Sequence, residues 1–154
     1  MGGSIILAGR LREVFLNGFW IANTNYQEQL RDLTWQQATQ KVGSLNTIAA
    51  LTFHINYYLK GFLAAFKSGK LEIHDKYSFD IPPTNSEIEW NKLVSDFLAN
   101  SEAFIQKVEG MNNEDLEKPF FEEKYGSFFR NIEGVIEHSY YHLGQISLIR
   151  KIIV

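Results

Sequence analysis

The chain has 154 residues, contains no cysteine and carries a formal net charge of −3. A chain of this length can bury a core without disulfides, so we expect a single domain over residues 1–154. The lack of cysteine excludes disulfides, thiolate metal ligands and a cysteine nucleophile. The acidic balance does not attract phosphate backbones, so we expect no nucleic-acid partner.

The N-terminal segment has a short apolar run at residues 5–8, followed by Arg10 and Arg12. This run is too short for a signal peptide or a membrane span, and no basic residue precedes it. We therefore expect a cytoplasmic protein without a membrane-embedded part.

Helical periodicity begins near Ile5 and continues to about Thr24. Apolar or small residues recur there at steps of three and four, namely Leu7, Leu11, Val14, Phe15, Gly18 and Ala22. A polar segment follows, in which Thr34 and Gln37 have the spacing of a capping box. The pattern predicts a long helix over residues 5–24 and a short helix that starts at Trp35.

A second long helix is predicted over residues 45–67. Its apolar stripe consists of Ile48, Leu51, Ile55, Tyr58, Phe62 and Ala65. Lys67 and Gly69 are typical of the last turn and the end of a helix. Residues 70–85 then form a long connection, in which the pair Pro82-Pro83 blocks a helix.

Two overlapping capping boxes precede the third long helix, one from Thr84 to Glu87 and one from Ser86 to Glu89. The helix starts at one of them and continues to about Gly110. Its apolar positions are Trp90, Leu93, Phe97, Phe104 and Val108.

The fourth long helix is predicted over residues 128–153, after a connection with one helical turn at residues 114–117. Its apolar positions are Ile132, Val135, Ile136, Leu143, Ile146 and Ile149. Since no segment alternates convincingly at a period of two residues, we expect an all-α fold, a four-helix bundle with long inter-helix connections. Long connections allow crossovers, so an up-down-up-down order cannot be assumed.

The four histidines offer one candidate site. His138 and His142 lie four residues apart, so both side chains leave the same face of the fourth helix. His54 lies in the middle of the second helix, on or beside its apolar stripe. If these helices are neighbours, three imidazoles converge on one divalent ion, Zn²⁺, Ni²⁺ or Fe²⁺, and leave positions open for water or substrate.

The alternative is that these are structural histidines whose nitrogens are satisfied by ordinary hydrogen bonds. A pair spaced by four residues is a weak signal on its own, because such pairs also arise by chance. The third histidine favours a metal, since three polar rings in an aromatic core need partners and an ion supplies one to each. Spacing alone leaves both interpretations open.

The isolated His54 and the run Ile136-Glu137-His138-Ser139-Tyr140-Tyr141-His142-Leu143-Gly144-Gln145-Ile146 resemble the DinB/YfiT-like family. That family has a bundle of four helices, with a metal triad of one histidine from helix two and an H-x-x-x-H pair from helix four. The resemblance covers most of the chain, including the helix order and the long second connection. It implies that His54, His138 and His142 hold a divalent metal ion.

Two polar residues near the pair are candidates for catalytic roles. Gln145 shares the face of His142, where it could orient that ring, hydrogen-bond a water at the ion or simply bridge helices. Glu137 points roughly 100° away from His138. It is a candidate second-shell acceptor or general base, although a solvated position is the alternative.

Other residues are expected around the site. Asn131 and Gly134 precede His138 on its face of the helix, and one of Tyr57 and Tyr58 is expected to border a pocket. At most one of the neighbours Tyr140 and Tyr141 can do so. The fourth histidine, His74, lies between two acids in a connection and is expected to be solvated.

The family implies a function as well, because characterised members include metal-dependent thiol transferases and isomerases that use low-molecular-weight thiols. Since this chain has no cysteine, a reactive thiol must belong to a small-molecule substrate. We expect a metalloenzyme that activates a small thiol or water for transfer or hydrolysis. The alternative is a non-catalytic metal- or ligand-binding or interaction bundle linked to a stress response.

The chain has 3 Trp, 7 Tyr and 12 Phe, more aromatic residues than a small helical core needs. Phe120-Phe121 and Phe128-Phe129 are adjacent pairs, and the two members of a pair are not expected to face one core. This surplus predicts a homodimer sealed by aromatic side chains.

Overall fold

The computed structural model describes residues 2–154, and all regular structure in that part of the chain is helical. The long elements are α1 (Gly3–Arg12), extended by a π-helical turn (Glu13–Asn17), α4 (Ile48–Ser68), α5 (Glu87–Glu109) and α7 (Phe128–Ile153). The short elements are α2 (Tyr26–Leu30), α3 (Trp35–Ala38), α6 (Asn113–Glu117) and two 3₁₀ turns, Asp75–Tyr77 and Glu123–Tyr125.

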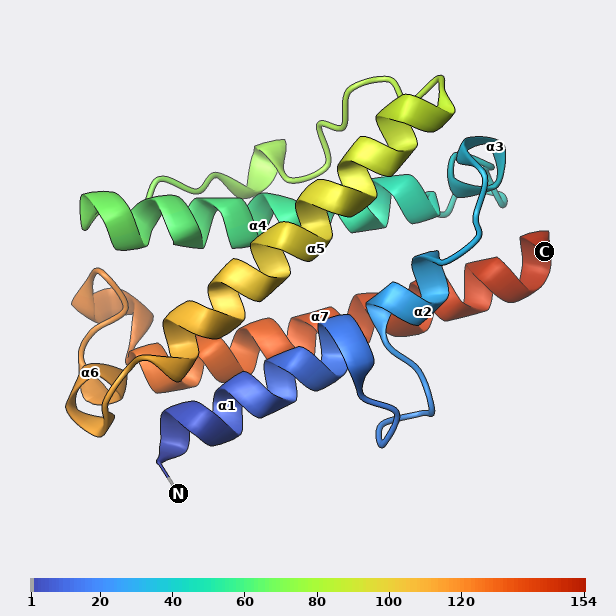
Figure 1. Ribbon diagram of the computed structural model, residues 1–154. Helices are drawn as coiled ribbons and strands as arrows, with labels where there is room; N and C mark the ends of the chain where they lie inside the picture. Colours follow the sequence, from blue (N-terminus) through green and yellow to red (C-terminus); the bar gives the residue numbers. More distant parts are fainter. Residues whose placement is uncertain (1) are drawn as a thin grey trace.

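The long helices do not alternate in direction. In Figure 1, α4 and α5 run the same general way, while α1 and α7 run the opposite way. The connection between α4 and α5, residues 69–86, therefore runs back along α4 before α5 begins (Figure 1). Helix α5 packs against both α1 and α4, and α7 packs against α4, so the apolar stripes of all four meet in one core.

Side-chain caps explain where three of the long helices start. The hydroxyl of Thr47 accepts a hydrogen bond from the backbone N–H of Ala50, so α4 starts three residues later than the predicted 45. Of the two overlapping boxes before α5, Ser86 supplies the cap. Ser127 caps α7, which has the predicted bounds.

The prediction for the first helix was wrong in its C-terminal third. Helical structure ends at Asn17, and Gly18 is extended, with φ −90° and ψ 148°. A Cβ atom at Gly18 would lie 1.9 Å from Cγ of Glu13, so this close chain reversal requires glycine. The residues up to Thr24 form an exposed loop that projects from the body (Figure 1). Gly18 and Ala22 therefore fall on the helical pattern without belonging to the helix.

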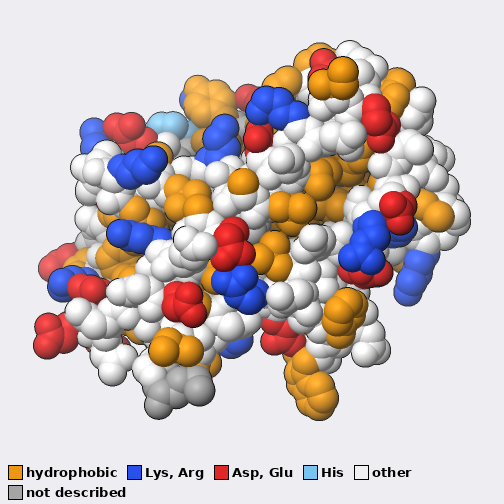
Figure 2. Space-filling view, viewed as in Figure 1, with side chains coloured by type: hydrophobic (Ala, Val, Ile, Leu, Met, Phe, Trp, Pro, Cys, Tyr) orange, Lys and Arg blue, Asp and Glu red, His pale blue; other side chains and the backbone are white. Residues whose placement is uncertain are grey.

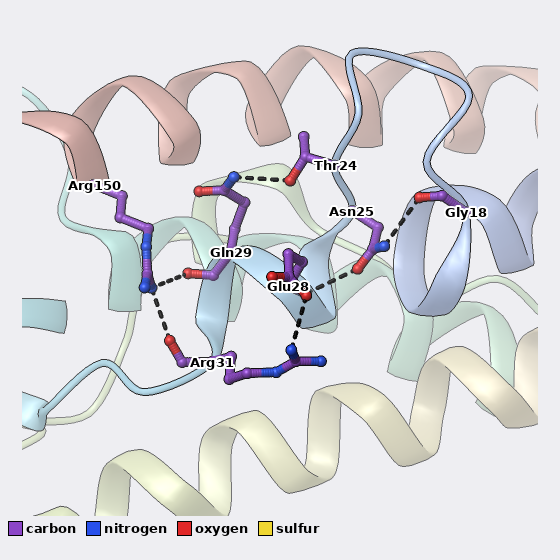
Figure 3. Close-up of polar contacts among 7 residues, drawn as sticks. All are labelled: Gly18, Thr24, Asn25, Glu28, Gln29, Arg31 and Arg150. Atoms are coloured by element: carbon purple, nitrogen blue, oxygen red, sulfur yellow. Dashed lines mark hydrogen bonds and ion pairs between the residues drawn. The ribbon is translucent and has the colours of Figure 1, made fainter.

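A polar network fixes the chain after that loop (Figure 3). The buried Asn25 donates to the carbonyl of Gly18 at 3.0 Å and accepts from the N–H of Glu28 at 2.8 Å, which caps α2. At the other end of α2, Arg150 of α7 donates to the carbonyls of Gln29 and Arg31, at 2.7 and 2.8 Å. Side chains distant in sequence thus hold this short helix in place.

Phe120 and Phe121 face the same core, contrary to the prediction for adjacent phenylalanines. Phe120 and Phe121 both join one intrachain cluster with Phe128, and their centroids lie 4.9 to 5.2 Å apart. The positive φ of 66° at Phe121 turns the backbone so that neighbouring side chains reach the same cluster. Only Phe129 of the four is exposed.

The surface carries charges of both signs. On the face shown in Figure 2, lysine and arginine side chains are interspersed with aspartate and glutamate, and no continuous basic stripe crosses that face. Within residues 2–154, no helix is both long enough and apolar enough to cross a membrane.

Candidate metal centre

The packing of α4 against α7 brings three histidines together. His54 lies in the middle of α4, and His138 and His142 lie one turn apart on α7. Nε2 of His138 lies 3.2 Å from Nε2 of His54 and 3.0 Å from Nε2 of His142. His54 and His142 are only 5% and 8% exposed, and one ligand nitrogen from each ring lies within 4.8 Å of the others. The three rings predicted from sequence therefore converge.

These separations suit a single ion. Two nitrogens bonded to the same ion at about 2.0–2.1 Å lie about 2.8–3.4 Å apart, for angles between a right angle and a tetrahedral one. The measured distances of 3.2 and 3.0 Å fall in this range. The residues are thus positioned to hold a metal ion.

Hydrogen bonds to the other ring nitrogens fix which atoms face the centre. Nδ1 of His54 lies 3.3 Å from the carbonyl oxygen of Ser78, and Nδ1 of His142 lies 2.7 Å from Oε1 of Gln145. Both partners accept, so each Nδ1 must carry the proton and each Nε2 must present a lone pair. A neutral His138 can donate from Nε2 to only one of them. A cation between the rings would satisfy all three nitrogens.

The surroundings keep the rings neutral. Burial, together with the neighbouring His142 and His138, lowers the pKa of His54 to about 4. Burial also lowers the pKa of His138 and of His142. Metal binding requires neutral imidazole, so these groups compete little with protons near pH 7.

The connection between α4 and α5 covers one side of the centre. Phe79 stacks on His54, with ring centroids 4.0 Å apart, and the carbonyl of the preceding Ser78 fixes that ring. Tyr58, which lies edge-on to His54, donates to the carboxylate of Asp75 at 2.7 Å. Sequence reasoning missed Asp75, Ser78 and Phe79, because no spacing rule indicates where a long connection crosses a helix.

The two polar candidates lie in different surroundings. Gln145 contacts the ring of His142, one of the arrangements expected for it. Glu137 is exposed, and its carboxylate pairs with Arg130 at 3.2 Å. The structure does not bring Glu137 to the three histidines.

A pocket of about 300 Å³ opens between α4 and α7, beside His138. Its lining comes from one face of each helix: Ile55, Tyr58, Leu59, Phe62, Asn131, Gly134, Val135, His138 and Ser139. Tyr58 borders this pocket, as expected for one tyrosine of the pair at 57–58, and Asn131 and Gly134 line it from the face of α7 that they share with His138. Tyr140 and Tyr141 do not line it.

Tyr57 and His74 contact each other outside the group of three histidines. The hydroxyl of Tyr57 hydrogen-bonds to the backbone carbonyl and N–H of His74. His74 itself is exposed in the connection, as predicted, and does not belong to the group of three rings.

Comparisons of the chain with protein-family models, with curated proteins and with solved structures found no match. The case for a metal centre in this chain therefore stands on the geometry of its own residues. That geometry combines convergent Nε2 atoms, anchored Nδ1 atoms and a pocket at one ring.

Proposed function

We propose that this chain is a divalent-metal-dependent enzyme that activates a small thiol or water for transfer or hydrolysis of a small-molecule substrate. His54, His138 and His142 would hold Zn²⁺, Ni²⁺ or Fe²⁺. The observation that carries the proposal is the convergence of three Nε2 atoms, two of them on rings whose Nδ1 is held by a carbonyl or amide oxygen.

A divalent ion at an open tri-histidine site lowers the pKa of a thiol or water and polarises a carbonyl. The chain's own residues would preorganise that site. Gln145 and the carbonyl of Ser78 fix two rings, and Phe79 covers His54. Burial and the hydrogen bond to Asp75 raise the pKa of Tyr58 to about 12, so its hydroxyl stays protonated at the border of the pocket.

A thiol fits the site better than water does. Hydrolysis benefits from a general base near the reacting water. The group of potential ligands in the described residues contains only the three histidines, and Glu137 pairs with Arg130 instead. A thiol has a lower pKa than water and needs less assistance to ionise. The thiol would come from a low-molecular-weight substrate.

The arrangement of the long helices supports the wider proposal of a DinB/YfiT-like four-helix bundle. Helices α1, α4, α5 and α7 share one core, and the long connection of residues 69–86 lies between the second and third of them. We further propose a cytoplasmic homodimer. The exposed aromatic residues Phe19, Trp20 and Phe129 are candidates for the contact between copies.

A non-catalytic function is the second candidate. The position of Glu137, away from the histidines, favours it, because the predicted carboxylate base does not reach the site, and the nearby carboxylate of Asp75 accepts a hydrogen bond from Tyr58. Such a protein would bind a metal or small ligand, or act as an interaction module in a stress response.

Turnover separates the two candidates. Metal-loaded protein is assayed with pairs of small thiols and electrophiles, beside free metal ion and the variants His138→Ala and His74→Ala. We expect turnover above the free ion in the wild type and in His74→Ala, and its loss in His138→Ala. If the wild type does not exceed the free ion across the panel, the non-catalytic candidate replaces the enzyme.

A further inference from the structure

One buried polar group in the pocket beside His138 has no partner. Ser139 lies on α7 between the two histidines of the pair, lines the pocket and is 1% exposed. Its Oγ makes no hydrogen bond to any of the described residues. A buried hydroxyl without a partner carries a desolvation cost that a hydrogen-bonding ligand would remove.

The rest of the lining restricts what that ligand can be. None of the nine lining residues is Lys, Arg, Asp or Glu. Five of them have no polar side-chain atom, namely Ile55, Leu59, Phe62, Gly134 and Val135. A charged group entering this pocket would lose water without gaining an ion pair. The apolar lining residues instead favour a ligand that is largely apolar.

The polar side chains of the lining are mostly engaged. The hydroxyl of Tyr58 donates to Asp75, and the amide nitrogen of Asn131 donates to the carbonyls of Tyr125 and Ser127. Among the lining side chains, Ser139 thus keeps a hydroxyl that is free to donate a hydrogen bond. It would set the orientation of a bound molecule relative to His138, which borders the same pocket.

We propose that this pocket binds an uncharged small molecule with an apolar body and one hydroxyl or carbonyl group, which hydrogen-bonds to Ser139 Oγ. This inference rests on the proposed function in one respect: the molecule bound there would be the substrate presented to the metal centre. The pocket itself exists independently of a metal, since α4 and α7 supply all its residues.

Gly134 controls the space available. A Cβ atom built on Gly134 meets nothing within 4 Å, so a larger side chain there would extend into open space bordering the pocket. The substitution Gly134→Leu should fill part of the pocket without disturbing the backbone of α7. Gly9 of α1 is a matched control, because it is also helical, is exposed and has nothing within 4 Å of an added Cβ.

The test uses three single-ring probes and a binding readout. Phenol, toluene and benzoate are titrated into ¹⁵N-labelled full-length protein, and amide chemical shifts of α4 and α7 are followed, first in metal-free protein and then after zinc loading. We expect phenol to bind at this pocket, toluene to bind more weakly, and benzoate to bind at least about tenfold more weakly than phenol. Benzoate binding as tightly as phenol would overturn the assignment of an uncharged ligand.

The variants test the residues. Ser139→Ala should weaken the binding of phenol about fivefold to tenfold and leave the binding of toluene unchanged, because only phenol loses a hydrogen bond. Gly134→Leu should abolish shifts at the pocket for both, while Gly9→Leu should leave them intact. The proposal would be overturned if Ser139→Ala lost the same affinity for phenol as for toluene, or if Gly134→Leu bound the probes as tightly as the wild type.

The titration of metal-free protein distinguishes a failure of this inference from a failure of the proposed function. Phenol binding in protein that takes up no zinc would refute the metal enzyme but support the pocket. Zinc binding in protein whose pocket accepts none of the probes would refute the pocket alone.

Discussion

The ring of Phe79 lies parallel to the imidazole of His54, with centroids 4.0 Å apart and an angle of 7° between the planes. Phe79 belongs to the connection between α4 and α5, and His54 to the middle of α4. Because the connection runs back along α4 (Figure 1), one segment both fixes the His54 ring through Ser78 and covers it through Phe79. The crossover topology thus contributes directly to the candidate metal centre.

Replacing Phe79 by alanine should weaken metal binding. A stacked aromatic pair contributes about 0.5–1.5 kcal/mol, so we expect zinc affinity to fall about twofold to tenfold. Competition with a chromophoric chelator measures this change. Phe129→Ala is the control, since Phe129 is 37% exposed, close to the 39% of Phe79, and lies in the first turn of α7, more than two turns before His138. Equal zinc affinities in the two variants would contradict a role for the stacking.

Gly61 of α4 lets the same connection approach the helix. A Cβ atom there would lie 2.4 Å from Cγ1 of Ile73, so Gly61→Ala must displace the connection or Ile73. Overpacking outweighs the gain in helix propensity, and we expect a loss of about 1–2 kcal/mol in the free energy of unfolding.

Gly9→Ala provides the reference for this substitution. Its added methyl meets nothing within 4 Å, so it should stabilise the protein by about 0.5–1 kcal/mol through helix propensity alone. Urea unfolding compares the two variants. If Gly61→Ala proves as stable as Gly9→Ala, the close approach of the connection is not maintained in solution.

Gln145 should control zinc affinity through the ring of His142. Its Oε1 accepts from Nδ1, so Gln145→Ala leaves that N–H without its acceptor. Losing such a partner typically costs about 10–100-fold in metal affinity. Gln145→Glu retains an acceptor at the same position and should bind zinc at least as tightly as the wild type. Equal affinities in the alanine and glutamate variants would argue that the contact does not orient the ring.

The stability of the metal-free protein should depend on the pKa of His54. Its folded-state pKa is about 4, below the ordinary value of 6.5, so between these pH values the unfolded chain binds more protons than the folded one. The free energy of unfolding should therefore fall as the pH falls from about 6.5 to about 4. Carboxylates add to this slope, so the difference between wild type and His54→Ala isolates the histidine. Parallel stability curves for the two proteins would contradict the lowered pKa.

Much of the helical framework follows from local signals. The bounds of α7 match the prediction because Ser127 caps the helix and its apolar residues keep a helical period. Gly69 ends α4 in a left-handed conformation, as its position after Lys67 indicates. These features depend on residues within one turn of each other, which a sequence displays directly.

The errors arise where distant residues decide the local structure. The end of the first helix depends on Gly18 lying against Glu13 and on Asn25 binding the Gly18 carbonyl, while Gly18 and Ala22 still fit a helical period. The histidine triad was within reach of spacing and resemblance. Phe79 was not, because its position depends on the path of a connection that tertiary packing determines.

The most direct measurement of the central claim is a zinc titration by isothermal calorimetry with a competing chelator, for the wild type, for the alanine variants of His54, His138 and His142, and for His74→Ala. The wild type and His74→Ala should each bind one zinc ion per chain with the same affinity. Each of the three other variants should lose more than about 100-fold in affinity, more than the loss of an outer-shell partner causes. If any one of the three retains the wild-type affinity, the histidines do not hold a common ion.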